Sequence, residues 1–330
     1  MAGRTDDLLT VVVRGRSTGL GRRVLAELAR RPGIEVLPTD DHDGRVDVIV
    51  DVVLADHDRL SGRQESVTAQ AVSLLEDAGA RRARALVVVS SAMVYGALAN
   101  NPIPLTEAAV LRPDPRFVYA RQLAAAEAAI EAWRVASRDR RVAMLRPSIP
   151  IAAGETSKLA DRLTAGFGMR FGDSDPGAQF VHLDDLAAAV AIAVERSLDG
   201  VFNVAPDGSI PGERVRALSG RTWRLPLPGI AADIADRVRF RLRRGVAPGF
   251  RAYTREPWIV ANDRLRAEGW EPRVTNEQAY VEGTEAPRWT TISPQRRQEL
   301  ALGLMAALIA GSSITILFAT VRRVGRLRRR

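Results

Sequence analysis

The stretch that decides the fold is LLTVVVRGRSTGLGRRVLAELARR, residues 8–31. Its first six residues form a continuous apolar run, as expected of a strand that is buried on both faces of a sheet. Glycines follow at positions 15, 19 and 21, and after them the pattern predicts a helix that runs to about Arg31. A buried strand, a glycine-rich turn and a helix in this order predict the first unit of a parallel sheet.

Strand-like and helix-like segments continue to alternate along the chain. Helices are expected over 65–80 and from Tyr119 onward. This alternation predicts an α/β fold with a Rossmann-like, doubly wound parallel sheet. The remaining strands are predicted over 34–40, 46–53, 85–91 and 141–147.

The glycine turn also carries a chemical signal. In such units one glycine makes the tight turn, another lets the backbone approach a pyrophosphate, and the phosphates rest on the helix N-terminus. Here the spacing is G-x-x-x-G-x-G, and Asp40 follows Gly21 by nineteen residues, where a carboxylate can bind a ribose hydroxyl. The turn therefore predicts dinucleotide binding. Asp40 favours NAD over NADP because it repels a 2′-phosphate, whereas Arg16 favours NADP.

The composition limits the other functions. The 330 residues include no cysteine, which excludes disulfides and thiolate metal sites. The formal net charge is +9, but six arginines lie in the last nine residues and leave about +3 on the rest. With positive and negative charges so nearly equal, the rest of the chain has no broad basic face, and we expect no nucleic-acid partner. The acidic, histidine-containing loops at 41–43 and 56–58 are interpreted as solvated turns, and no metal site is expected.

The C-terminal segment has a different character. Residues 300–321, LALGLMAALIAGSSITILFATV, contain no charged residue and would form a helix of about 33 Å, against about 30 Å of bilayer hydrocarbon. We expect a linker over 287–299, a transmembrane helix over 300–321 and an Arg-rich tail over 322–330. A buried core helix is the alternative. Small residues recur on one face of this helix and could pair two copies into a homodimer: Gly303, Ala307 and Gly311.

The N-terminal sequence predicts on which side of the membrane the N-terminal domain lies. The apolar run over 8–13 is too short for a signal peptide and is interrupted by Arg14. We therefore expect a protein of the cell membrane whose N-terminal domain is cytoplasmic. The charge pattern disagrees, because more arginines follow the apolar segment than precede it, which would place the tail inside.

Further motifs share their order and spacing with a known family. Together with the glycine turn, they resemble the extended short-chain dehydrogenase/reductases, the NAD-dependent epimerase/dehydratase family, over about residues 8–273. The resemblance implies a Rossmann-type domain over 1–286, with a substrate lobe mainly at 148–178 and 205–286. Besides Tyr119, the motifs are VVVSSAMVYG (87–96), PIPLTE (102–107), LRP (145–147), FVHLDDLA (180–187), GVFNVAPDG (200–208) and IVANDRLRAEGWEP (259–272).

The resemblance also implies a reaction and a set of site residues. The family typically oxidises a hydroxyl-bearing compound, such as a nucleotide sugar, transiently with bound NAD. Ser91 would then hydrogen-bond the reacting oxygen, and Tyr119 would be the general acid/base. The cofactor-binding residues would be Gly15, Ser17, Gly19, Leu20, Gly21 and Asp40.

The sequence departs from the family in two places. The family has a lysine four residues after the tyrosine, whose ammonium lowers the tyrosine pKa and holds the nicotinamide ribose. Here that position is Leu123, so we expect Tyr119 to keep a pKa of about 10, the ordinary value for tyrosine. In addition, only residues 41–45 separate Asp40 from the next strand, where the family has another helix and strand. Their absence would trim one sheet edge and expose the adenine side of a cofactor.

Two functions follow from these features. The first is a membrane-tethered, NAD-dependent oxidoreductase or epimerase-type enzyme that acts on a nucleotide sugar or a related, including lipid-linked, substrate. The second is a non-catalytic relative that serves as a nucleotide-sensing or protein-binding module at the membrane. Family resemblance favours the enzyme, whereas Leu123 and the trimmed adenine side favour the module.

Overall fold

The structure, a computed structural model, describes residues 8–38, 44–54, 66–167, 176–218 and 249–284. The chain divides into two compact units, Met1–Glu285 and Ala286–Arg330, and all of the described residues belong to the first. Asp40, the predicted transmembrane helix over 300–321 and its small-residue face lie outside the described residues. Within the described ranges, no helix is both long and apolar enough to cross a bilayer.

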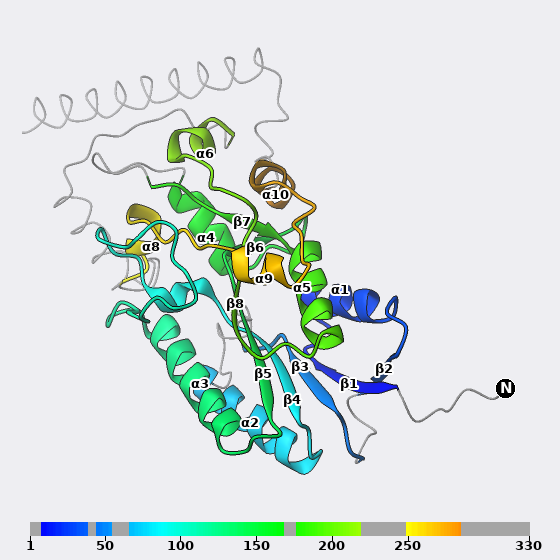
Figure 1. The fold of residues 1–330 in the computed structure, drawn as a ribbon. Coiled ribbons are helices and arrows are strands. Elements are labelled where there is room, and N and C mark those ends of the chain that lie inside the picture. Colours follow the sequence, from blue (N-terminus) through cyan, green and yellow to red (C-terminus); the bar gives the residue numbers. More distant parts are fainter. Residues whose placement is uncertain (1–7, 39–43, 55–65, 168–175, 219–248, 285–330) are drawn as a thin grey trace, which may run out of the picture. The chain divides into compact units, whose positions relative to one another are not determined.

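A parallel sheet forms the centre of the described unit (Figure 1). Its strands lie in the order β2-β1-β3-β4-β5-β8, and every neighbouring pair is parallel. The predicted α/β fold is therefore confirmed, although three of the strands end earlier than the sequence predicts. The bounds are β1 (Leu9–Arg14), β2 (Ile34–Leu37), β3 (Val48–Asp51), β4 (Ala85–Val89), β5 (Arg141–Pro147) and β8 (Gly200–Val204).

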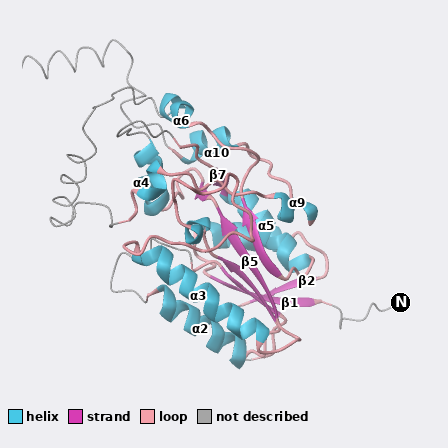
Figure 2. Cartoon of the chain, turned by 60° about the vertical axis from the view of Figure 1, so that its left-hand side comes forward, coloured by secondary structure: helices cyan, strands magenta, loops and turns pink. Residues whose placement is uncertain are grey.

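Helices cover both faces of this sheet (Figure 2). On one face α1 (Gly19–Leu28) packs beside α5 (Leu183–Glu195), and on the other α2 (Val67–Ala80) packs beside α3 (Val118–Val135). The strands between them consist mainly of apolar residues, because both of their faces are covered: all four residues of β3 are buried, Asp51 among them. The result is two hydrophobic cores, one on each side of the sheet.

A smaller lobe continues from the end of β5. Only Ser148 separates β5 from β6 (Ile149–Ile151), which pairs in parallel with β7 (Phe180–His182). Because β5 leads directly into β6, the lobe stands over the carboxyl ends of the central strands. Short helices complete the described residues: η3 (Ala92–Tyr95), α4 (Lys158–Phe167), α6 (Gly212–Leu218), α8 (Ala252–Arg255), α9 (Asp263–Ala267) and α10 (Asn276–Gly283).

Strand β2 lies at one edge of the sheet. It pairs with β1, and no strand of the described ranges lies on its other side. The next strand, β3, pairs with β1 on the opposite side.

A buried ion pair joins α3 to the carboxyl ends of the central strands. Arg146 lies 2.6 Å from Glu127, and the two side chains are 6% and 5% exposed. Ser90 donates a hydrogen bond to the same carboxylate, and Arg146 donates to the Tyr95 hydroxyl at 2.9 Å. Burial raises the pKa of Tyr95, so its hydroxyl stays protonated and donates to Asn203. These contacts tie β4, β5, β8 and α3 together.

The ion pair generates a stability prediction. Glu127→Gln leaves the Arg146 charge buried without its counter-charge, so we expect the free energy of unfolding to fall by about 3–5 kcal/mol. Glu131→Gln is the matched control, since Glu131 lies one turn further along α3 and pairs with Arg134 in solvent. Its effect should stay within about 1 kcal/mol. Urea unfolding followed by circular dichroism measures both, and equal effects would contradict the importance of the buried pair.

Candidate functional site

The glycine turn between β1 and α1 depends on its glycines for local reasons. Gly15 has a φ of +87°, and a Cβ there would lie 2.8 Å from the side chains of Val52 and Val53. A Cβ on Gly21 would lie 2.1 Å from the carbonyl oxygen of Gly15. Both glycines are therefore required by the close packing of turn, strand and helix, as the spacing predicted. A side chain at either position would disturb the turn itself as well as any ligand.

The N-terminus of α1 is capped from within the turn. The Thr18 hydroxyl accepts a hydrogen bond from the Gly21 N–H at 2.9 Å and donates to the Gly15 carbonyl at 2.8 Å. The first turn of the helix contains no acidic residue. The N–H groups of Gly19 and Leu20, which have no partner inside the helix, remain at this end. This end of α1 consequently favours an anion.

One cavity connects this helix end with the predicted catalytic residues. It has a volume of about 260 Å³, and its wall includes Gly19 and Leu20 at one end as well as Ser91 and Tyr119. The structure thus brings together four residues that the sequence predicted. Three others, Gly15, Ser17 and Gly21, belong to the turn but do not line this cavity, and Asp40 lies outside the described residues.

Ser91 and Tyr119 reach the cavity from neighbouring elements. Ser91 follows β4 and caps the N-terminus of the short helix η3. Its hydroxyl accepts a hydrogen bond from the Met93 N–H at 3.2 Å. Tyr119 lies in the first turn of α3, as predicted, and is 7% exposed. Its ring lies 5.9 Å from that of Phe117. The carboxyl end of β4 therefore positions Ser91, and the N-terminal turn of α3 positions Tyr119.

The position that the family gives to lysine lies in the core. Leu123 is fully buried in the hydrophobic cluster between α3 and the sheet. Among the described residues that line the cavity there is no lysine or arginine, and Glu155 is the only charged side chain.

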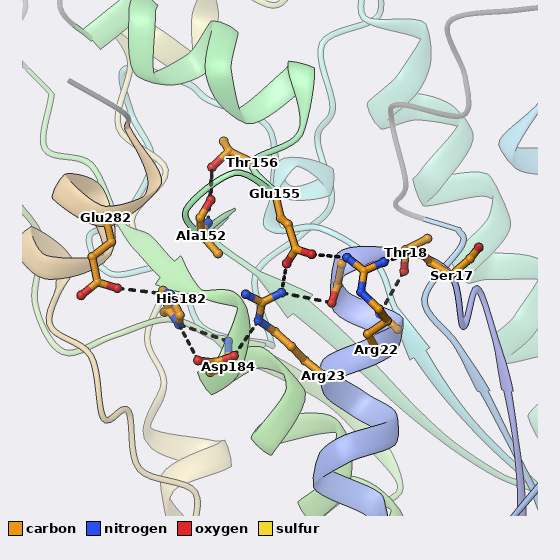
Figure 3. Close-up of polar contacts among 12 residues, drawn as sticks. Ser17, Thr18, Arg22, Arg23, Ala152, Glu155, Thr156, His182, Asp184 and Glu282 are labelled. Atoms are coloured by element: carbon orange, nitrogen blue, oxygen red, sulfur yellow. Dashed lines mark hydrogen bonds and ion pairs between the residues drawn. The ribbon is translucent and has the colours of Figure 1, made fainter. Parts of the chain in front are cut away.

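Two residues of the cavity wall were missed from the sequence. Ser148 links β5 to β6, is 4% exposed, and its hydroxyl has no hydrogen-bond partner among the described residues. Glu155 lies in the loop before α4 and forms ion pairs with Arg22 and Arg23 of α1 (Figure 3). Ser148 directly follows the LRP motif and could have been noticed, whereas nothing near Glu155 indicated its contact with α1.

The turn also reaches the end of β2. The Arg16 guanidinium donates to the carbonyl oxygen of Leu37 at 3.3 Å. Arg16 thus lies near the strand after which Asp40 follows, the position that distinguishes NAD from NADP in sheets of this type. The described residues are compatible with NAD and with NADP.

The fold and the cavity define a Rossmann-like α/β protein with its site at the carboxyl ends of the strands. Residues 12–205 match the model of the family described as the NAD dependent epimerase/dehydratase family. This match spans more than half of the chain, and the chain belongs to that family. No curated protein matches the sequence.

Solved structures share this fold. UDP-glucose 4-epimerase of Thermus thermophilus, in complex with NAD, is 18% identical, with 83% of this chain and 97% of the epimerase covered and a TM-score of 0.57. dTDP-glucose 4,6-dehydratase of Bacillus anthracis, in complex with NAD, is 17% identical, with 86% and 97% covered and a TM-score of 0.56. A human epimerase family protein with NADPH is 18% identical, with 83% and 98% covered and a TM-score of 0.58.

The chain's own residues fit a dinucleotide at this cavity. The carboxylate of Glu155 already stands at the N-terminus of α1 as an internal anion. The Ser148 hydroxyl is buried in the cavity wall and lacks a partner, as expected where a ligand group completes the hydrogen bonding. The cavity joins these features to Ser91 and Tyr119.

The burial of Leu123 yields a prediction about the missing lysine. Leu123→Lys places an ammonium in an apolar core, so we expect a loss of about 3 kcal/mol or more in the free energy of unfolding. Leu123→Met conserves volume and should cost less than about 1.5 kcal/mol. Thermal and urea unfolding of both variants provide the measurement. If Leu123→Lys were as stable as Leu123→Met, the position would open to the cavity and the lysine would be tolerated beside Tyr119.

Proposed function

We propose that the chain is an NAD(P)-dependent enzyme of the epimerase/dehydratase type that acts on a hydroxyl group of a nucleotide sugar or a related, including lipid-linked, substrate. The observation that carries the proposal is the single cavity that joins the N-terminus of α1 to Ser91 and Tyr119. Two structural neighbours support it, because they are named as enzymes of UDP-glucose and dTDP-glucose and are solved with NAD.

Particular residues would hold the cofactor. The N–H groups of Gly19 and Leu20 would receive its pyrophosphate, since the N-terminus of α1 favours negative charge. Asp40 would bind a ribose hydroxyl if the cofactor is NAD, whereas Arg16 near Leu37 suits the 2′-phosphate of NADP. The bound nicotinamide would supply a hydride acceptor and donor.

Ser91 and Tyr119 would handle the proton that accompanies hydride transfer. The Ser91 hydroxyl would orient the reacting oxygen, and the Tyr119 phenolate would take its proton. Because Leu123 stands where the family resemblance places a lysine, we propose that turnover is slow at neutral pH and rises toward pH 10.

An activity assay tests the role of Tyr119. Conversion of UDP- and dTDP-sugars by the full chain is followed by chromatography of the sugar products between pH 7 and pH 10, because bound cofactor that is reduced in one step is re-oxidised later in the same cycle. Tyr119→Phe should lower the rate by about 100-fold or more, the contribution of a general acid/base. Tyr280→Phe is the control, because Tyr280 is buried in α10 and does not line the cavity. Equal rates for wild type and Tyr119→Phe would remove the tyrosine from the mechanism.

A non-catalytic nucleotide-sensing or protein-binding module is the second candidate. It is favoured by the burial of Leu123 and by the absence of a cation among the described lining residues. The same assay separates the two functions. Cofactor binding by calorimetry, without turnover of any nucleotide sugar at any pH, would support the module.

We further propose that the chain is held at the cell membrane by a helix over 300–321, with the Rossmann-like unit on the cytoplasmic side. The support is the uncharged length of this segment, which matches the bilayer, and the arginines on both of its sides. Gly303, Ala307 and Gly311 would provide a close-packed face if two such helices pair.

Cell fractionation tests the anchor. The full chain should sediment with membranes and require detergent for extraction, because about 20 apolar residues stabilise a spanning helix. Deletion of residues 293–330 should release the remaining chain into the soluble fraction. A full chain that is soluble without detergent, and that behaves like the deletion, would contradict the anchor.

A further inference from the structure

The carboxylate of Glu155 lies on the N-terminus of α1. A Cβ built on Gly19, the first residue of the helix, would lie 2.9 Å from both the carboxyl carbon and Oε2 of Glu155. Gly19 is therefore the glycine of the turn whose open side faces a charged group. In this part of a Rossmann-like unit, the backbone approach that glycine permits is the approach to a pyrophosphate.

Two arginines hold this carboxylate. Arg22 and Arg23, in the first turns of α1, each form an ion pair with one oxygen of Glu155 (Figure 3). Both arginines have further partners: Arg22 donates to the Ser17 carbonyl at 2.7 Å, and Arg23 donates to the Gly19 carbonyl at 3.2 Å and to the Asp184 carboxylate at 2.6 Å. The two guanidinium groups and the helix end thus form a preorganised binding position for an anion.

The loop that carries Glu155 is anchored next to it. The Thr156 hydroxyl donates to the carbonyl oxygens of Ala152 at 2.8 Å and of Gly283 at 2.9 Å. The loop backbone is therefore held independently of the ion pairs. The Glu155 side chain itself is 25% exposed and ends at the cavity, so it can change its rotamer without moving the loop.

A second observation points to a ligand in the same cavity. The Ser148 hydroxyl lines the cavity, is 4% exposed and has no hydrogen-bond partner among the described residues. A buried hydroxyl without a partner costs free energy, which a bound ligand can recover. Among the described residues that line the cavity, Glu155 has internal partners, whereas the Ser148 hydroxyl has none.

We propose that Glu155 is an internal occupant of the diphosphate position, and that a diphosphate-bearing nucleotide binds only by displacing this carboxylate from Arg22 and Arg23. This inference rests on the proposed function. A diphosphate beside the carboxylate would meet like charge, whereas a displaced Glu155 leaves Arg22 and the Nη1 side of Arg23 for the phosphate oxygens, with Arg23 Nε still paired to Asp184. The fraction of chains with Glu155 displaced then sets the observed affinity.

Titration calorimetry on the full chain tests the inference with two probes, NAD and inorganic pyrophosphate. Glu155→Gln removes the charge and keeps the shape, so both ligands should bind about tenfold tighter or more, the equivalent of one charge-assisted hydrogen bond. Glu155→Ala should change the affinity in the same direction. Glu195→Gln is the matched control, because Glu195 pairs with Arg31 just beyond the opposite end of α1 and should leave both affinities unchanged.

The outcomes separate this inference from the proposed function. Tighter pyrophosphate binding by Glu155→Gln, without NAD binding by any variant, would support Glu155 as the occupant and contradict the proposed cofactor. Unchanged or weaker pyrophosphate binding by both Glu155 variants would overturn the inference, even where NAD binds. An equal gain in Glu195→Gln would also overturn it, since the effect would then arise from net charge alone.

Discussion

The buried ion pair between Arg146 and Glu127 fixes the relation between α3 and the carboxyl ends of the strands. Each partner is costly to bury alone, so the two must meet, and the Tyr95 hydroxyl together with Asn203 completes their surroundings. The glycine turn, Ser91, Ser148 and the start of α3 all lie at this edge of the sheet. The ion pair and the parallel strands thus hold these elements at the edge of the cavity. The Glu155 side chain on the cavity wall is held by its ion pairs with Arg22 and Arg23.

Most of the fold could be predicted from residue patterns. Continuous apolar runs such as 8–13 predicted strands buried on both faces, and the parallel sheet with paired helices confirms this. The spacing of Gly15 and Gly21 predicted a turn so close that neither position has room for a Cβ. The strand ends were less accurate, because the apolar residues Val52 and Val53 continue past Asp51, where the pairing of β3 ends. Single-residue patterns report burial, but they do not report where a hydrogen-bond ladder stops.

The candidate site was predicted only in part, for a physical reason. Ser91, Tyr119 and the turn lie on elements whose order is set by the sheet, so their meeting follows from topology. Glu155 reaches α1 from a loop of the other lobe, more than 130 residues later in the chain, and this approach depends on tertiary packing. No local pattern encodes it. Leu123 was noticed as a departure from the family, but only the structure shows that it is core.

Among the described residues that line the cavity, none carries a positive charge, and Leu123 stands where the family resemblance places a lysine. The cations near the cavity, Arg22 and Arg23, are engaged with Glu155 at the anion end, and none of the described lining residues is basic at the Tyr119 end. A dinucleotide that displaces Glu155 would bring its negative charge to the arginines at the helix end of the cavity. Cofactor binding would then depend on Arg22 and Arg23, and proton transfer would depend on Tyr119.

The most direct measurement of the central claim is a crystal structure of the chain grown with saturating NAD. The account predicts the pyrophosphate at the N-terminus of α1, the nicotinamide beside Ser91 and Tyr119, and the Glu155 carboxylate turned away from Arg22 and Arg23. NAD bound elsewhere on the chain would contradict the account. So would a cavity without NAD in which Glu155 keeps its two ion pairs.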